Sequence, residues 1–292
     1  MNPELFRLLL ETKALEIAPE NRPFWYTSGT IGPFYLNTHY LYGSREKAEE
    51  LLVFIDQHQN DRAALLSGVI ARVEKNYAED AGYRTVIAAA AALARREIGV
   101  DNIDFVSGGE RRDWFFSIMT AKQLDKPALF ICKDQSVLTF DRDIHETKNL
   151  AGARVLHVAD LVTEASSYVR AWLPALQKCG GELSWAINIV DRGQGGGSVL
   201  RERGVQAYHL IEIGPAFFEK LKQDGYLDAA RADRLRAYHH NPRESMKRML
   251  QAQPEILRQA LNSDDEKIRK RARLLVDQNV YDFPRAFLES LS

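Results

Sequence analysis

Short apolar runs alternate with helical patterns through the middle of the chain, and this order constrains the fold more than any other feature. Each run is long enough for one buried strand, and segments with helical periodicity separate the runs. Parallel strands joined by crossover helices produce this order. The runs lie at residues 103–107, 128–132, 155–159, 183–190 and 207–213. We therefore predict an α/β fold with a mostly parallel sheet flanked by helices.

Helical periodicity surrounds this core on both sides. Apolar residues spaced three and four apart predict helices at 4–17, 45–56, 62–79 and 83–98. After Gly214-Pro215 the strand-like runs stop, and residues 217–291 are expected to be all-helical. We therefore predict a first domain over 1–214 and a helical extension over 215–292. Acidic residues at 264–266 balance a basic cluster in the extension, so this cluster is expected to form a solvated helix face. The cluster comprises Arg269, Lys270, Arg271 and Arg273.

Charge and cysteine content exclude several classes of function. The formal net charge of −1 gives no electrostatic reason to bind nucleic acid or an anionic membrane. The two cysteines, Cys132 and Cys179, lack the paired spacing of a metal site, and a reduced cytosol explains them most simply. The longest apolar run, 86–94, is too short to span a bilayer, and the N-terminus has no signal-peptide pattern. We therefore expect a cytoplasmic protein without membrane or nucleic-acid partners.

The loop after the third apolar run has the composition of a ligand site. In open parallel sheets, ligands bind beyond the carboxyl ends of the strands. Here the strand runs into Asp160, and a turn of small and hydroxyl residues, 163–167, opens a helix. The free N–H groups of a helix start attract phosphate, and Asp160 could accept hydrogen bonds from ribose hydroxyls beside it. An ordinary solvated helix start, capped by Thr163 with Glu164 at the positive end of the dipole, fits the spacing equally well.

Other segments carry unusual residues at comparable positions. The stretch 26–37 combines flat aromatic side chains with turn residues, which suits a cover over a planar base or an aromatic hairpin in a core. Residues 189–197 end a strand in Asp191-Arg192 before a glycine-rich loop. The guanidinium there suits a carboxylate ligand, or it is simply solvated on a flexible loop. Segments 107–113 and 130–136 each place charged residues directly after a strand.

Taken in order, these five segments resemble the motifs of orotate phosphoribosyltransferases, which have the type I phosphoribosyltransferase fold. Residues 155–167 are similar to the family's sugar-diphosphate signature, and 26–37 to its hood segment, which covers the pyrimidine. The resemblance implies an N-terminal hood ahead of the sheet, with Asp160 and Lys133 as catalytic residues. The implied sugar-diphosphate contacts are Glu110, Arg111, Lys133, Asp160, Leu161, Val162, Thr163, Glu164, Ala165, Ser166 and Ser167. The implied orotate contacts are Tyr35, Leu36, Thr163 and Arg192.

The chain departs from the family pattern at several charged positions. Ala159 stands where the first acid of the signature usually is, and Ala165 where a glycine usually is. Thr27, Cys132 and Ser136 occupy positions where the family carries basic residues. Arg111 replaces the lysine that contacts the diphosphate. Other basic residues that could compensate are Arg112, Arg142 and Lys148.

The resemblance implies an enzyme that transfers phosphoribosyl from 5-phosphoribosyl 1-diphosphate to orotate, giving orotidine 5′-monophosphate and diphosphate. Mg²⁺ would bridge diphosphate and ribose oxygens of the substrate, with no metal site built from protein ligands alone. A homodimer is also implied. Because basic positions are lost, a non-catalytic nucleotide-binding or sugar-phosphate-binding regulatory protein is the main alternative. A phosphoribosyltransferase for another base, or an enzyme that cleaves a nucleotide, is a third.

Overall fold

The computed structural model describes residues 2–291, and the chain divides into two compact units. The first unit comprises Met1–Ala14 and Asn37–Glu212, and the second comprises Leu15–Leu36 and Ile213–Ser292. The sequence analysis attached the whole hood segment to the first domain. In the structure most of that segment belongs to the same unit as the C-terminal helices, so two parts of the chain about 200 residues apart fold together.

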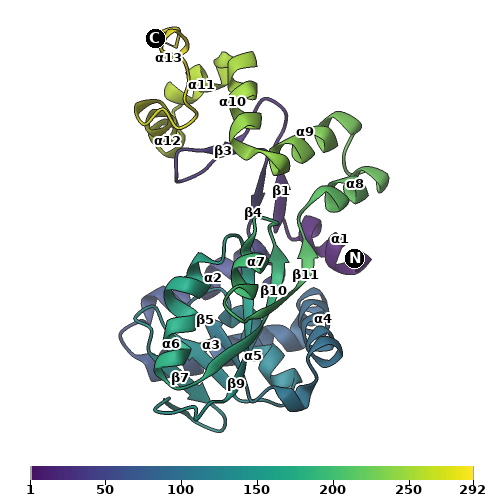
Figure 1. Cartoon of the computed structure of the whole chain (residues 1–292), viewed down its shortest axis with the longest axis vertical. Helices are drawn as coiled ribbons and strands as arrows, with labels where there is room; N and C mark the ends of the chain where they lie inside the picture. Colours follow the sequence, from purple (N-terminus) through teal and green to yellow (C-terminus); the bar gives the residue numbers. More distant parts are fainter. Residues whose placement is uncertain (1, 292) are drawn as a thin grey trace. The chain divides into compact units, whose positions relative to one another are not determined.

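The first unit is built on a seven-stranded sheet with the order β11-β10-β9-β5-β6-β7-β8 (Figure 1). The strands β11, β10, β9, β5 and β6 run parallel, and β7 and β8 are antiparallel additions at one edge. Their bounds are β5 Phe105–Gly109, β6 Ala128–Ile131, β7 Val137–Phe140, β8 Ile144–Glu146, β9 Arg154–Val162, β10 Glu182–Asp191 and β11 Gln206–Glu212. The five predicted runs are the five parallel strands, and the predicted fold class is confirmed.

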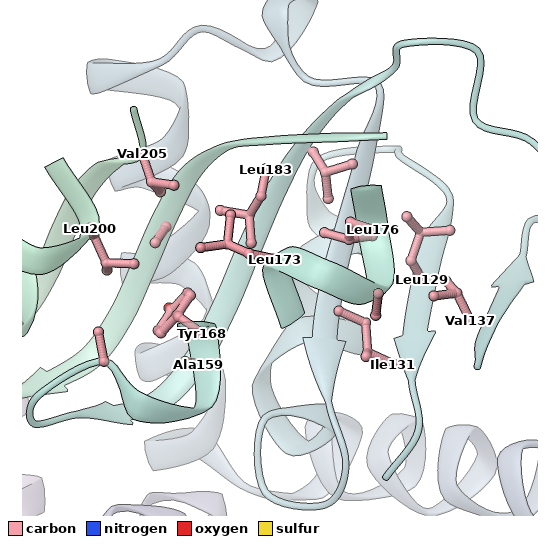
Figure 2. Close-up of a cluster of buried hydrophobic side chains, with 14 of the residues drawn as sticks. Leu129, Ile131, Val137, Ala159, Tyr168, Leu173, Leu176, Leu183, Leu200 and Val205 are labelled. Carbon is pink, nitrogen blue, oxygen red and sulfur yellow. The ribbon is translucent and has the colours of Figure 1, made fainter. Parts of the chain in front are cut away.

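Helices cover both faces of this sheet because its strands are apolar on both sides. On one face, η3 and α6 bury a cluster that includes Val155 and Ala159 of β9 (Figure 2). On the other, α5 packs on β5 and β9, and α4 reaches β10 and β11. The helical elements are α1 Pro3–Glu11, η1 Thr38–Tyr42, α2 Arg45–Gln57, α3 Arg62–Glu79, α4 Ala81–Glu97, η2 Val100–Asn102, α5 Trp114–Gln123, η3 Tyr168–Trp172, α6 Leu173–Lys178 and α7 Gly196–Arg201.

The helix predicted at 4–17 is wrong in its second half. It ends at Glu11, and the hydroxyl of Thr12 donates to the Leu8 carbonyl at 2.7 Å. Lys13 then adopts a positive φ of 58°, which breaks the helical path. Residues Leu15–Ile17 form β1, which pairs antiparallel with β4, Phe34–Leu36. Apolar spacing alone did not reveal this long-range pairing. The stretch after β6, where we predicted no strand, forms the β7–β8 hairpin.

The second unit combines two short strand pairs with helices. One pair is β1–β4, and the other is the hairpin formed by β2, Phe24–Trp25, and β3, Ile31–Gly32. Prolines begin three of the helices at the first turn, where a missing N–H costs nothing. The helices are α8 Pro215–Gln223, α9 Ala229–His240, α10 Pro242–Ala252, α11 Pro254–Leu261, α12 Glu266–Asp277 and α13 Arg285–Glu289. Within residues 2–291, no helix is long and apolar enough to cross a membrane.

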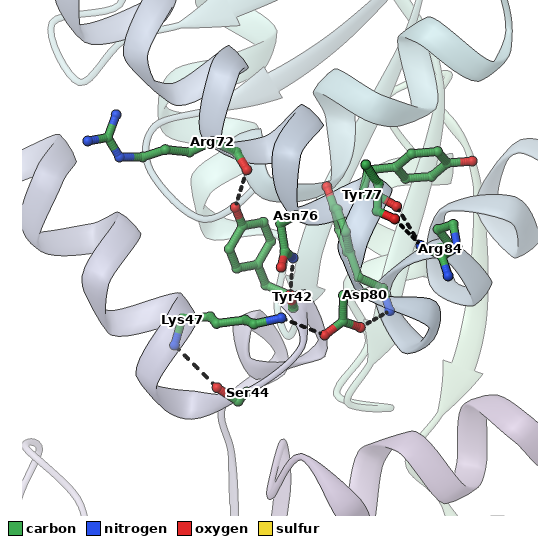
Figure 3. A network of polar contacts seen from close by, with 10 residues as sticks. Tyr42, Ser44, Lys47, Arg72, Asn76, Tyr77, Asp80 and Arg84 are labelled. Atoms are coloured by element: carbon green, nitrogen blue, oxygen red, sulfur yellow. Dashed lines mark hydrogen bonds and ion pairs between the residues drawn. The ribbon is translucent and has the colours of Figure 1, made fainter.

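A polar network around Asp80 fixes the helices of the first unit against one another (Figure 3). The Asp80 carboxylate accepts from the Tyr83 amide at 2.8 Å, which caps α4, and from Lys47 of α2 at 2.8 Å. Tyr42 of η1 donates to the Arg72 carbonyl of α3 at 3.0 Å. Burial alone would raise the pKa of Asp80, but the hydrogen bonds from Lys47 and Tyr83 outweigh it, and the pKa is lowered. One carboxylate therefore ties α2 to the junction of α3 and α4.

We expect Asp80→Ala to lower the free energy of unfolding by about 1–2 kcal/mol, the cost of a helix cap plus a partly exposed ion pair. Asp61→Ala is the matched control, because Asp61 caps α3 through the Ala64 amide without a recorded ion pair. It should cost about 1 kcal/mol. Since the pKa of Asp80 is lowered in the folded state, its contribution is present above about pH 4 and is lost as the pH falls. Urea unfolding at pH 7 and pH 3 checks both points. An equal loss for Asp80→Ala at the two pH values would contradict this assignment.

Candidate functional site

The carboxyl ends of the parallel strands bring four of the predicted loops together in the first unit. Gly109 at the end of β5 pairs with Ile131 at the end of β6, and Val162 of β9 pairs with Asp191 of β10. The loops that begin after these residues therefore start at neighbouring points on one sheet edge. They carry Glu110 and Arg111, Lys133, the turn 163–167 and Arg192. The remaining two predicted residues, Tyr35 and Leu36, lie on β4 of the second unit.

The turn after β9 leads from the strand into a helix within a few residues. Asp160, Leu161 and Val162 still belong to the strand, and helical backbone begins at Ser166. Between them Ala165 adopts a φ of 57°, in the left-handed region that favours glycine. The sugar-diphosphate signature that this segment resembles usually has glycine at this position. The turn therefore keeps a glycine-like conformation although alanine has replaced the glycine. The first N–H groups of the helix lack intrahelical acceptors and are available to an anion.

Backbone hydrogen bonds hold the turn against the glycine-rich loop that carries Arg192. The Arg192 amide donates to the Val162 carbonyl at 2.9 Å, and the Gly196 amide donates to the Thr163 carbonyl at 2.9 Å. A Cβ at Gly196 would lie only 2.6 Å from that carbonyl oxygen, so the close approach requires glycine. Thr163 and Arg192, the two predicted orotate contacts of this unit, are therefore fixed on adjoining loops.

A second acid, Asp113, accompanies Asp160 and was not assigned a role from the sequence. Its carboxylate accepts from the Gly109 amide at 3.0 Å and from the Asp160 amide at 3.0 Å. Asp113 is 3% exposed and Asp160 is 8% exposed. Burial raises the pKa of Asp160 above its ordinary value, and the neighbouring charge of Asp113 raises it further. Burial likewise raises the pKa of Asp113, against the lowering effect of its two backbone donors. The charge of Asp113 acts on Asp160, so ionisation of both buried carboxyls at once is unfavourable.

A buried polar chain extends from this acid pair into the sheet. The Ser107 hydroxyl and His157 Nδ1 lie 2.8 Å apart, and His157 Nε2 lies 3.5 Å from Asp113 Oδ2. The order of groups is that of a hydrolytic triad, but Ser107 and His157 are both 0% exposed on neighbouring strands, so no substrate could reach the hydroxyl. Burial lowers the pKa of His157 to about 3, and its ring stacks on Trp172 with centroids 4.3 Å apart. This buried series of Ser107, His157 and Asp113 therefore supports the strands and is not a catalytic centre.

The basic residues of the site are arranged differently from the sequence-based expectation. Arg111, predicted to contact the diphosphate, forms an ion pair with Asp56 of α2. Lys133 is held by Glu110, which accepts from its amide at 3.0 Å and lies 3.6 Å from its Nζ. Arg112 is exposed, and its charge lowers the pKa values of both Asp113 and Asp160. The charge of Arg112 therefore acts on both acids of the pair.

Two buried polar atoms on η1 have no hydrogen-bond partner among residues 2–291. They are Thr38 Oγ1 and His39 Nδ1. The element η1 packs against β9, and the charges of Arg112 and Arg111 act on His39. Burial first, and then these two arginines, lower the pKa of His39 to about 3, so its ring is neutral. Unsatisfied buried polar atoms are costly, and they occur beside functional sites more often than elsewhere.

The sequence carried a signal for Asp113 and Arg112 but none for His39. Asp113 opens a helix directly after a Gly-Gly strand end, which is where a buried cap is expected, and Arg112 precedes it. Sequence alone could not tell which of two adjacent arginines faces the acid pair. His39 lies in an aromatic stretch whose residues give no hint of a polar contact.

Comparisons with known proteins agree with the motif resemblance. No family model matches the chain. Orotate phosphoribosyltransferase of Pyrococcus furiosus is 25% identical over 217 residues, which cover 74% of this chain and 96% of that protein. The same enzyme of Saccharolobus solfataricus is 36% identical over 80 residues, which cover 27% of this chain and 40% of that protein. Among solved structures, orotate phosphoribosyltransferase of Francisella tularensis matches with a TM-score of 0.54 at 14% identity, covering 80% of this chain and 96% of that one.

This structural likeness shows that the chain has the type I phosphoribosyltransferase fold. Its similarity in sequence to proteins named orotate phosphoribosyltransferase confirms the resemblance inferred from the motifs. The comparisons do not test individual site residues, so their roles remain predictions.

The acid pair should make the stability of the protein depend on pH. Because the pKa of Asp160 is raised in the folded state, the folded protein binds its proton more tightly. The stabilisation that comes from protonated Asp160 is fully present below about pH 4 and is lost as the pH rises through the raised pKa of Asp160. Asp160→Asn cannot ionise and relieves Asp113 of a like charge. We therefore expect the free energy of unfolding to fall less steeply with rising pH in Asp160→Asn than in wild type, measured by urea unfolding from pH 4 to pH 8.

Asp104→Asn is a control for which the pH dependence of stability should have the opposite sign. Hydrogen bonds from the Arg154 amide and side chain lower the pKa of Asp104, so this substitution should cost stability above about pH 4 and none below it. Parallel stability curves for wild type and Asp160→Asn would contradict the buried acid pair.

Proposed function

We propose that this protein is an orotate phosphoribosyltransferase, which converts orotate and 5-phosphoribosyl 1-diphosphate to orotidine 5′-monophosphate and diphosphate. One observation supports it most strongly: the turn 163–167, Asp160 and Arg192 stand on one sheet edge with direct backbone bonds between the two loops. A phosphate, a ribose and a planar carboxylate-bearing base need these three kinds of partner. The names of the similar proteins point to the same reaction.

In this proposal each part of the site has one task. The N–H groups at the start of the helix after Ala165 bind the 5-phosphate, and the small side chains of Ser166 and Ser167 allow it to approach. Asp160 accepts hydrogen bonds from the ribose hydroxyls. Thr163 and Arg192 hold the base, with the guanidinium fork on the orotate carboxylate.

The chemistry requires charge stabilisation around a departing diphosphate. The anomeric carbon becomes positively charged as its bond to the diphosphate oxygen breaks. The ring nitrogen of orotate then forms the new bond and loses its proton to the departing diphosphate or to solvent. The Asp160 carboxyl lies beside the ribose and accepts from its hydroxyls, and Arg112 places positive charge at the same sheet edge. Holding both substrates in line accounts for a further large part of the rate.

Mg²⁺ would arrive with the substrate. The oxygen donors of the site, the Asp160 carboxyl and the hydroxyls of the turn, are compatible with a hard cation of this kind. When bound it would neutralise the diphosphate and make it a better leaving group.

A specific observation favours a binding protein as the second candidate. Both Arg111 and Lys133, the predicted diphosphate contacts, are engaged by carboxylates of the chain itself, Asp56 and Glu110. Such a protein would bind the sugar diphosphate without breaking its bond. In either case we propose a cytoplasmic homodimer, which sedimentation at several protein concentrations would test.

Arg112 should contribute more to sugar-diphosphate binding than Arg111. Arg112→Ala removes the cation that acts on the acid pair and should weaken binding of phosphoribosyl diphosphate with Mg²⁺ by about 1–3 kcal/mol, the scale of a charged hydrogen bond. Arg111→Ala is the matched control one residue away and should weaken it less, because Arg111 must leave Asp56 to reach the ligand. Calorimetric titration decides the order, and a larger loss for Arg111→Ala would restore the sequence-based assignment.

Arg192 should distinguish orotate from uracil. Arg192→Ala leaves the orotate carboxylate without its partner in a partly dry pocket, which should cost about 2–5 kcal/mol. Arg192→Lys keeps the charge but loses the planar fork, so recovery should be partial. Uracil has no carboxylate, and its binding should be nearly unchanged in both variants. Binding of the two bases is measured with phosphoribosyl diphosphate and Mg²⁺ present. Equal losses for both bases, or no loss for orotate, would reject the orotate assignment.

A further inference from the structure

The hairpin β2–β3 is packed on helices from the far end of the chain. This hairpin contains the first part of the hood segment, and β4, which carries Tyr35 and Leu36, follows it directly. Within the second unit, β2 contacts α12 and β3 contacts α10 (Figure 1). These helices lie about 210 to 250 positions later in the sequence than the strands they contact. The helices therefore contribute directly to the conformation of the hairpin.

Tyr281 holds one strand of the hairpin by its backbone. Its hydroxyl accepts from the Ile31 amide at 2.9 Å and lies 3.4 Å from the Ile31 carbonyl, to which it donates. Tyr281 is 2% exposed and Ile31 is 1% exposed, so water does not compete for these groups. Burial raises the pKa of Tyr281 to about 12, and the hydroxyl therefore keeps its proton near neutral pH. Each of the two polar backbone groups of Ile31 thus depends on one side chain.

Arg271 holds the other strand. Its guanidinium donates to the Trp25 carbonyl at 2.7 Å, so the expectation that it belongs to a purely solvated helix face is wrong for this residue. On the turn between the strands, Gly29 has a φ of 79°, and a Cβ there would lie 3.1 Å from Leu274 of the same helix. Glycine at this position therefore serves both the turn and the close approach of α12.

Aromatic packing anchors the strand that follows. Phe34 of β4 contacts Phe218 of α8, with ring centroids 6.0 Å apart, and Tyr238 of α9, with centroids 5.6 Å apart. Side chains alternate along a strand, so Tyr35 lies on the opposite side, where its ring contacts Phe24 and Tyr26 at 5.7 Å each. The helices thus hold one face of β4, while Tyr35 belongs to an aromatic group of the hood segment itself.

We propose that the C-terminal helices are a support that fixes the hood segment in its base-binding conformation, with Tyr281 and Arg271 as positioning residues. The proposal rests on the proposed function only for the identity of the base. Neither residue needs to touch substrate: Tyr281 acts through Ile31, and Arg271 through Trp25. Loosening either bond should raise the KM for the base while leaving binding of the sugar diphosphate, assigned to residues of the first unit, unchanged.

The test compares Tyr281→Phe and Arg271→Ala with Arg273→Ala, which removes an exposed arginine from the same helix. The first readout is amide hydrogen exchange at residues 25–31, which requires no substrate. We expect exchange of the Ile31 amide to increase roughly 5- to 100-fold in Tyr281→Phe, as follows from losing a buried hydrogen bond. The second readout is steady-state kinetics. We expect the KM for orotate to rise roughly 3- to 30-fold in both variants, and the KM for phosphoribosyl diphosphate to stay within about twofold.

The possible outcomes separate this proposal from the proposed function. Unchanged amide hydrogen exchange in both variants would overturn the proposal that the helices fix the hood segment. Faster exchange with an unchanged KM for orotate would also overturn it. Equal increases in both KM values, or the same effects in Arg273→Ala, would indicate general destabilisation and also overturn it. If wild type does not convert orotate, the proposed function fails, and the exchange data alone decide whether the helices hold the hairpin.

Discussion

The carboxylate of Asp113 joins the end of β5 and the start of α5 to β9, which lies 47 residues later at Asp160. It stands at the start of α5 and accepts the amides of Gly109, at the end of β5, and of Asp160, near the end of β9. Both donors converge on one buried acceptor, so moving either strand end would leave a buried polar group or charge unpaired, at a cost of about 3 kcal/mol or more. The placement of Asp160, and through β9 that of the turn at 163–167, therefore depends on this one side chain.

We propose that the same arrangement suits a ligand that brings hydroxyl groups to Asp160 and phosphate groups to Arg112 and the helix start. Two buried acids repel each other, Arg112 offsets them only partly, and the neutral ring of His39 lies near by. Ribose hydroxyls would donate to Asp160, and phosphates would meet Arg112 and the free amides of the helix start. Each of these contacts relieves a cost that the protein carries without a ligand.

Sequence determined the sheet and much of its ligand-facing edge because both depend on local patterns. Strands β5, β6, β9 and β10 are largely buried on both faces and read as apolar runs, and Asp160, Thr163 and Arg192 follow those runs. Long-range contacts left no such trace. Three contacts join segments that no periodicity connects. They are the pairing of Leu15–Ile17 with β4, the hydrogen bond from Arg271 to the Trp25 carbonyl and the ion pair of Arg111 with Asp56. The β7–β8 hairpin was missed because its strands are only four and three residues long and lie within a polar stretch.

Whether the chain breaks the bond to diphosphate or only binds the sugar is the central question, because the fold allows both. The most direct measurement is orotate-dependent release of diphosphate from phosphoribosyl diphosphate and Mg²⁺ by the full chain, with orotidine 5′-monophosphate quantified in parallel. The proposed function predicts that both products appear in equal amounts, only when orotate is present, and that Asp160→Asn reduces the rate. Tight binding of phosphoribosyl diphosphate with no diphosphate released in the presence of orotate would contradict it and identify a binding protein on the same fold.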